Sequence, residues 1–197
     1  MVVEVRIVVT DAAPLISLAA AGTLDYLIYP ALPVIIPDAV FHEATASAGK
    51  LGAQEILDWY RAHLDAVRIE PTAIFLDEMT LREADGRRLV RDLGERAALE
   101  VIRNYPLAED ERALMLIDDR GAERLIVIDP AKLIPLTTWD YLRQLEEAQR
   151  IQSADAVMDS IRAAGRNPSA RDLWSGHDPE IRDAVWAVLT EARAPKA

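Results

Sequence analysis

The chain has 197 residues, of which 51% are hydrophobic and 28% charged, and it contains no cysteine. This length fits one domain with a sizeable core, and the lack of cysteine excludes disulfides, thiolate metal sites and cysteine nucleophiles. The formal net charge is −11. Basic and acidic residues balance from Arg150 onward, so the excess of acids lies in residues 1–149. An acidic chain binds nucleic acid poorly without local arginines, a bridging metal or a basic partner.

The start of the chain lacks the basic region and apolar segment of a signal peptide. No apolar run approaches the roughly 20 residues that a membrane helix needs. Together with the absence of cysteine, these features predict a cytoplasmic protein that does not associate with membranes.

Short apolar runs alternate with helical patterns over the first 150 residues. We expect strands at 2–9, 33–37, 67–69, 113–117 and 133–137. We expect helices at 14–22, 23–29, 39–46, 51–64, 94–105, 120–128 and 139–150, the last opened by Thr138 or Asp140. Segment 72–91 is expected to be partly helical, and residues 125–128 could instead form a strand. This alternation predicts an α/β fold with a mostly parallel sheet and helices on both faces.

The pattern changes at about Ile151. A helix is expected at 153–164, a linker at 165–169 and a second helix at 179–192. We therefore predict a sheet-containing domain over residues 1–150 and a helical extension over residues 151–197.

Two of the strand-like runs end directly at acidic residues. Asp11 follows the first run, and Asp118 and Asp119 follow the fourth. Ligands of parallel sheets bind beyond the carboxyl ends of the strands, where the strand order reverses, so these acids would meet if the two strands are neighbours. Glu43 and Glu95 lie on predicted helices. Carboxylates without His or Cys suit Mg²⁺ or Mn²⁺, which can polarise a phosphate and lower the pKa of a water molecule.

Each acid also has a structural interpretation. Asp11 could cap the following helix, and Asp38 rather than Glu43 could be the important acid, as a cap. Glu95 follows Asp92 at capping-box spacing. The acid pair after the fourth run could be a solvated turn. The chain has no GxGxxG or GxxxxGK[ST] motif, which argues against a dinucleotide-binding site and a P-loop. It also has no GxSxG motif, which argues against the nucleophile elbow of α/β-hydrolases.

Four stretches, taken in order, resemble the PIN-domain ribonucleases, and within them the VapC-like toxins of toxin–antitoxin operons. These stretches are 9–16, 34–43, 93–99 and 116–122. The resemblance covers about residues 2–148. It implies a three-layer α/β/α fold with a central parallel sheet in the order 3-2-1-4-5, usually dimeric. It also implies an acidic pocket that binds Mg²⁺ or Mn²⁺ and hydrolyses RNA phosphodiesters.

The resemblance assigns roles to individual positions. The catalytic acids would be Asp11, Glu43, Glu95 and Asp118, and the metal ligands Asp11, Glu95, Asp118 and Asp119. Asp119 is either a fifth oxygen ligand or the true fourth acid. Thr137 would bind substrate, at a place where the family often has a small hydroxyl. Apart from the resemblance, Arg120 and Arg124 after the acid pair are candidate contacts to RNA phosphate. Arginines suit bidentate phosphate contacts, although these could also be surface charges that offset nearby acids.

The resemblance also has departures. The third acid is Glu95 where the family more often has Asp, segment 72–92 is longer than expected, and the extension over 151–197 is atypical of a minimal toxin.

We therefore expect a metal-dependent endoribonuclease that acts as the toxin of a toxin–antitoxin pair, with an antitoxin protein as partner and a homodimeric state. One alternative is a PIN-like protein-interaction module that no longer cleaves, which the acidic surface and helical tail would suit. Another is a related Mg-dependent DNA nuclease of the 5′-flap type.

Overall fold

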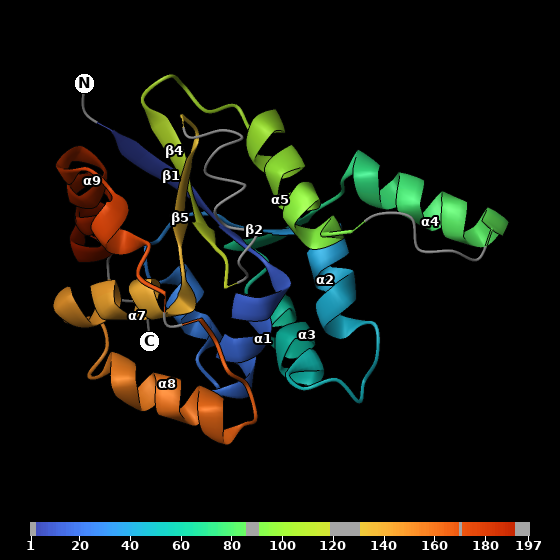
Figure 1. Ribbon diagram of the computed structural model, residues 1–197, viewed down its shortest axis with the longest axis horizontal. Coiled ribbons are helices and arrows are strands. Elements are labelled where there is room, and N and C mark those ends of the chain that lie inside the picture. Colours follow the sequence, from blue (N-terminus) through green and yellow to red (C-terminus); the bar gives the residue numbers. More distant parts are fainter. Residues whose placement is uncertain (1–2, 86–90, 119–130, 170, 192–197) are drawn as a thin grey trace.

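A computed structural model describes residues 3–85, 91–118, 131–169 and 171–191. They form a five-stranded sheet in the order β3-β2-β1-β4-β5, and all four neighbouring pairs are parallel. The strands are β1 (Glu4–Thr10), β2 (Val34–Pro37), β3 (Val67–Glu70), β4 (Glu111–Leu116) and β5 (Leu133–Leu136). Figure 1 shows this sheet flanked by helices. The α/β class and the strand order predicted from the sequence are confirmed.

The central strands are apolar on both faces. In β4, Leu114 and Leu116 belong to the core on one face of the sheet, whereas Ala113 and Met115 belong to the core on the other. Side chains alternate between the two faces of a strand, so burial on both faces requires a continuous apolar run. This explains why the strands could be recognised from uninterrupted apolar segments.

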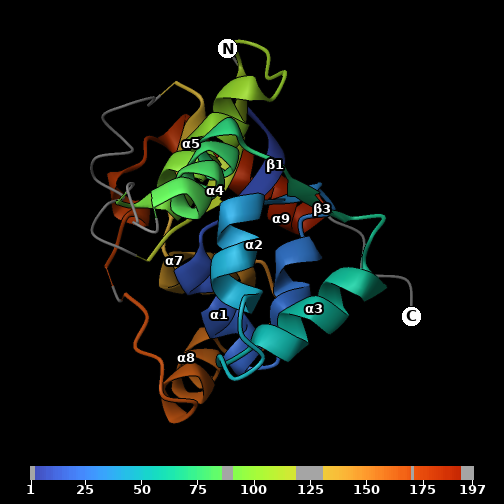
Figure 2. The ribbon, with the colours of Figure 1, turned by 90° about the vertical axis from the view of Figure 1, so that its right-hand side faces the viewer.

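One face of the sheet carries most of the helices. They are α1 (Ala12–Ala20), the 3-10 helix η1 (Leu24–Ile28), α3 (Ala53–Ala62), α7 (Thr138–Glu147), α8 (Ala154–Ala163) and α9 (Pro179–Glu191). The other face is covered by α5 (Leu93–Asn104), whose buried side chains include Leu99 and Ile102. In Figure 2, α1, α2 and α3 lie together below the sheet. A further 3-10 helix, η2 (Trp174–Gly176), precedes α9.

Two helices lie beyond the carboxyl ends of β2 and β3. These are α2 (Asp38–Thr45) and α4 (Ala73–Asp85). Helix α4 projects away from the body of the molecule (Figure 1). Its base is anchored where Ile74 and Phe75 pack on a small cluster made by α2 and α5. Segment 72–91 was expected to be partly helical, and α4 covers Ala73–Asp85 of it, while residues 86–90 lie outside the described residues. The helix or strand expected within 120–128 lies outside the described residues.

The hydrophobic core continues past residue 150. Ile151, Met158, Ile161 and Leu189 are buried in the same cluster as residues of β1 and β4. The residues predicted as a helical extension therefore pack into the same core and complete one layer over the sheet. Among the described residues, no helix is long and apolar enough to cross a membrane.

Candidate active site at the carboxyl edge of the sheet

The acids after β1 and β4 lie at the same edge of the sheet. The two strands are neighbours, with Thr10 paired to Leu116. The backbone N–H of Asp11 donates to the carbonyl of Leu116 at 2.9 Å, and Asp118 follows two residues later. Strand β1 has β2 on one side and β4 on the other, so this is the point where strand order reverses. Parallel sheets bind ligands at such a point.

Asp11 is a buried acid. Only 9% of its surface is exposed, and its pKa is raised from 3.8 to about 6. Burial is the main cause, and the negative charges of Glu43 and Asp118 add to it, while the backbone N–H groups of Ala12 and Ala13 oppose it. Although Asp11 stands at the N-cap position of α1, its side chain makes no capping hydrogen bond. The N–H groups of Ala12 and Ala13 still favour its charged form, but they do not offset the effect of burial on its pKa.

Gly94 brings the start of α5 close to Asp11 and Glu43. A Cβ atom at Gly94 would lie 3.0 Å from Asp11 Oδ1, 3.3 Å from Val40 Cγ2 and 3.8 Å from Glu43 Oε2. An added Cβ atom would crowd the Asp11 carboxylate and the Val40 methyl group, whereas its distance to Glu43 is an ordinary contact. The carboxylates of Asp11 and Glu43 therefore both lie near Gly94, and Glu95 is the next residue along α5.

Glu43 and Glu95 differ in environment. Glu43 is exposed on α2, whereas Glu95 is partly buried in the first turn of α5. A capping box between Asp92 and Glu95 would require the Asp92 side chain to accept a hydrogen bond from the start of α5. The Asp92 side chain accepts no such bond, and its backbone is left-handed at φ 54°.

Asp118 is held by a single threonine. Its Oδ1 accepts from the backbone N–H of Thr138 and its Oδ2 from the Thr138 hydroxyl, both at 2.8 Å. Burial raises the pKa of Asp118, while the two Thr138 bonds and the positive charge of Arg166 oppose that rise. Asp140 adds to the rise with its negative charge. The side chain thus has one orientation and faces both an acid and a cation.

Thr137 has a structural task. It is the N-cap of α7 and forms a capping box with Asp140, so the expectation that Thr138 or Asp140 opens this helix is wrong. The Thr137 hydroxyl accepts from Asp140 N–H and donates to the carbonyl of Arg171, each at 3.0 Å. The threonine that bonds Asp118 is its neighbour Thr138. Substrate binding by Thr137 stays a prediction.

Asp38 is likewise structural. Its carboxylate accepts hydrogen bonds from the Thr72 hydroxyl at 2.7 Å, from Thr72 N–H at 3.0 Å and from Ala39 N–H at 2.9 Å. These bonds fasten the start of α2 to the segment after β3. This structural role agrees with the alternative that Asp38 serves the start of the helix, and the role of Glu43 in the site stays a prediction.

Sequence reasoning missed Arg166. This residue follows α8, 153 positions from Ala13, yet its Nη2 lies 3.4 Å from the Ala13 carbonyl, and its charge acts on Asp118. The only local feature in the sequence that points to Arg166 is the preceding Gly165. A glycine just after a helix commonly ends that helix in a defined geometry, which also sets the backbone position of the next residue.

A divalent cation fits the chemistry of these side chains. The donors are carboxylates, which suit Mg²⁺ or Mn²⁺, and Asp11 has two anionic neighbours whose repulsion a cation would relieve. Within the described residues, no three His, Cys, Asp or Glu side chains form a group that could hold a metal. Three predicted positions, Asp119, Arg120 and Arg124, lie outside those residues, so their roles stay predictions.

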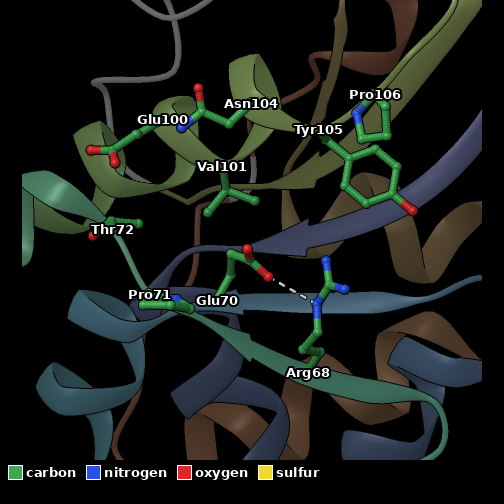
Figure 3. Close-up of a pocket in the computed structure, with 9 residues that line it drawn as sticks. All are labelled: Arg68, Glu70, Pro71, Thr72, Glu100, Val101, Asn104, Tyr105 and Pro106. Carbon is green, nitrogen blue, oxygen red and sulfur yellow. Dashed lines mark ion pairs between the residues drawn. The ribbon is translucent and has the colours of Figure 1, made fainter.

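A cavity of about 280 Å³ lies elsewhere, between β3 and the end of α5 (Figure 3). Its charged groups are already engaged. Arg68 pairs with Glu70 at 2.9 Å, and the Glu100 carboxylate accepts from the N–H groups of Ala73 and Ile74 at the start of α4. This cavity offers less chemistry than the carboxyl edge of the sheet.

Comparison with known proteins gives one finding about the family. A protein-family model described as a PIN domain matches residues 7–165. No curated protein and no solved structure matches the chain. The matched range begins within β1, includes β2 to β5 and ends at Gly165. It takes in α8, which the predicted boundary at residue 150 had placed in the extension.

Proposed function

The chain belongs to the PIN-domain family, and we propose that it is a divalent-metal-dependent ribonuclease. PIN domains are generally nucleases, so the family indicates hydrolysis of phosphodiester bonds. One observation carries the proposal: the buried carboxylate of Asp11 lies with two further acids at the point where strand order reverses. A fold without a cation to bind would gain nothing from this arrangement, because burial and like charges both destabilise it.

The proposed catalytic acids are Asp11, Glu43, Glu95 and Asp118. Asp11, Glu95, Asp118 and Asp119 would hold Mg²⁺ or Mn²⁺. A bound divalent cation supplies positive charge that stabilises the phosphate oxygens during hydrolysis.

The chain's other residues position these acids. Thr138 fixes both oxygens of Asp118, so this carboxylate is oriented before any substrate arrives. Gly94 lets the start of α5 approach Asp11, and the proposed acid Glu95 is the next residue of that helix. Acids held on strand ends and helix starts are better oriented than acids on loops.

Cleavage of a labelled single-stranded RNA tests the proposal. The wild type should cleave this RNA in the presence of Mg²⁺ or Mn²⁺, and cleavage should stop when a chelator is added. Asp11→Asn and Asp118→Asn should each lower the cleavage rate at least about a hundredfold, as expected for groups that stabilise developing charge. Asp58→Asn is the control, because Asp58 is an exposed acid on α3 that bonds only Gln54 and Arg61 among the described residues.

Calorimetry provides a second readout. The wild type should bind Mn²⁺. The affinity of Asp11→Asn for Mn²⁺ should be lower by at least about tenfold, whereas that of Asp58→Asn should equal the wild-type affinity. A wild-type protein that binds no divalent cation would contradict the proposal. Cleavage of DNA but not RNA in the same assay would instead favour the flap-type DNA nuclease.

We also propose that the nuclease is the toxin of a toxin–antitoxin pair, active in the cytoplasm as a homodimer. Its support is the sequence resemblance to VapC-like toxins. Expression should arrest growth, co-expression of a small protein encoded beside it should restore growth, and Asp11→Asn should be harmless. Sedimentation of the purified protein would test the dimer.

A specific feature favours a second candidate, a non-cleaving interaction module. Helix α4 projects from the body (Figure 1), and Leu76 and Leu81 on it are 67% and 45% exposed. Exposed apolar side chains on a projecting helix suit contact with another protein. Metal binding without turnover of any RNA or DNA would favour this candidate.

A further inference from the structure

We propose that Arg166 binds an RNA phosphate beside the acids, so that the C-terminal part of the chain supplies a substrate contact. The proposal rests on the ribonuclease function proposed above. It concerns a residue outside the four stretches that resemble the PIN-domain ribonucleases and one position beyond the part of the chain that the family model matches.

The end of α8 fixes the position of Arg166. Gly165 is left-handed at φ 85°, its N–H donates to the carbonyl of Arg162 at 2.9 Å, and the N–H of Arg166 donates to the carbonyl of Ile161 at 3.1 Å. These two bonds form a Schellman motif, which ends a helix in one defined geometry. Ile161 is fully buried, so the motif is attached to the core.

From this anchor the Arg166 side chain extends to the site. Its Nη2 reaches the Ala13 carbonyl in the first turn of α1, two residues after Asp11, at the long distance of 3.4 Å. The same guanidinium acts electrostatically on Asp118. Arg166 therefore stands between the element that begins at Asp11 and the acid that follows β4.

The guanidinium keeps unused donors. Its Nε is buried and has no hydrogen-bond partner among the described residues, and the long contact to Ala13 is its only side-chain bond in the same part of the chain. A buried N–H without a partner is unfavourable, and a guanidinium has five donors arranged to grip phosphate oxygens. Arg182 also has a buried Nε without a partner, but its Nη2 donates to the Ser175 carbonyl at 2.6 Å and its guanidinium lies over Trp174.

The charge of the whole chain favours such a contact. The net charge is −11, and the site itself consists of acids, so RNA needs a local cation as it approaches. Phosphate is the group on RNA that matches the unused donors, whatever the base sequence.

Binding of a short fluorescein-labelled single-stranded RNA tests the proposal, measured in chelator so that cleavage does not interfere. Arg166→Gln should weaken binding about tenfold, the loss of one charge-assisted contact. The slope of log affinity against log salt should fall by roughly 0.7, one phosphate contact on a single strand. Arg166→Lys keeps the charge, so it should keep the wild-type slope and lose only part of the affinity.

Arg162→Gln is the matched control. Arg162 is an exposed arginine on α8, one turn earlier, and it pairs with Asp159 at 2.8 Å. Its removal should leave the affinity and the salt slope unchanged. If Arg166 only braces α8 against α1, Arg166→Gln would lower the melting temperature and leave the salt slope unchanged, and that result would overturn the proposal.

A measurement on the unaltered protein covers the case in which Arg166→Gln does not fold. The Nε–H resonance of Arg166, assigned with Arg166→Lys, should shift as RNA is added, whereas that of Arg162 should not. No shift at saturating RNA would overturn the proposal. If the wild type cleaves no RNA yet this signal shifts, the phosphate contact stands and the nuclease function fails.

Discussion

At the scale of single residues, the buried charge of Asp11 lowers the stability of the folded protein. Its pKa is about 6 in the folded protein and 3.8 as the ordinary value. The folded protein therefore binds this proton more tightly than the unfolded chain, and stability falls as the pH rises from about 4 to about 6. Two pKa units correspond to about 3 kcal/mol. This cost is the physical signature of a carboxylate placed for function.

Asp11→Asn should remove that cost. In chelator, the variant should be more stable than the wild type by up to about 3 kcal/mol above pH 7, with the difference vanishing below about pH 4. Urea unfolding over this pH range measures it. Glu55→Gln, at an exposed position on α3, should show no such pH dependence. A constant difference between Asp11→Asn and wild type would contradict the assignment of the shift to Asp11.

Gly94 matters because it has no side chain. Gly94→Ala would place a Cβ atom 3.0 Å from Asp11 Oδ1, so the carboxylate must move by a few tenths of an ångström. We expect RNA cleavage to fall about tenfold or more, because small displacements in a reacting site are costly. Unfolding free energy should change by less than about 1 kcal/mol, since alanine favours the helix by a similar amount.

Kinetics and urea unfolding of Gly94→Ala check this prediction together. Gly176→Ala is the control, because a Cβ atom there meets nothing within 4 Å. Unchanged cleavage by Gly94→Ala would show that the approach of α5 to Asp11 is not needed for catalysis.

At the scale of elements, two helices end in comparable ways with different consequences. Gly22 follows α1 at φ 68° and Gly165 follows α8 at φ 85°, and a Cβ atom would meet nothing at either position. A substitution at either glycine therefore acts through backbone strain alone. Only the end of α8 is followed by a residue that reaches the acids.

Gly22→Ala and Gly165→Ala should therefore destabilise the protein alike, by about 1 kcal/mol each. RNA affinity should fall only in Gly165→Ala, because only that strain moves Arg166. Thermal unfolding and RNA titration of the two variants measure both effects. Equal RNA affinity in the two variants would argue that the end of α8 does not position a substrate contact.

At the scale of the whole molecule, the C-terminal helices are part of the core. Met158 and Ile161 of α8 and Val185 and Leu189 of α9 are buried in the cluster that includes β1 and β4. The chain also folds back at a second place, where the Asp140 carboxylate accepts from Thr137 N–H and Leu173 N–H. A chain ending at Arg150 would expose an apolar face of the sheet.

A chain truncated after Arg150 should lose cooperative unfolding, because it loses several fully buried side chains worth about 2 kcal/mol or more each. Circular dichroism during heating would show a broad transition or aggregation in place of a sharp one. Removal of only residues 192–197 is the control and should leave the transition sharp. A cooperative transition in the truncated chain would show that residues 1–150 fold alone.

The sequence by itself determined the α/β class, the five strands and their order, and the position of acids at strand ends. These features depend on local patterns: continuous apolar runs mark strands buried on both faces, and a family resemblance over ordered short motifs carried the strand order. The sheet edge at which Asp11 and Asp118 meet follows from parallel pairing, because the carboxyl ends of parallel strands share one edge.

Only the tertiary structure decided which neighbours those acids have. It placed the N–H and hydroxyl of Thr138 on Asp118. It brought Gly94 against Asp11 and Arg166 toward Asp118. It also carried one core across residue 150. These contacts depend on how the helices pack over the sheet. That packing is fixed by contacts between side chains distant in sequence, and the hydrophobic periodicity of a single helix or strand carries no information about them.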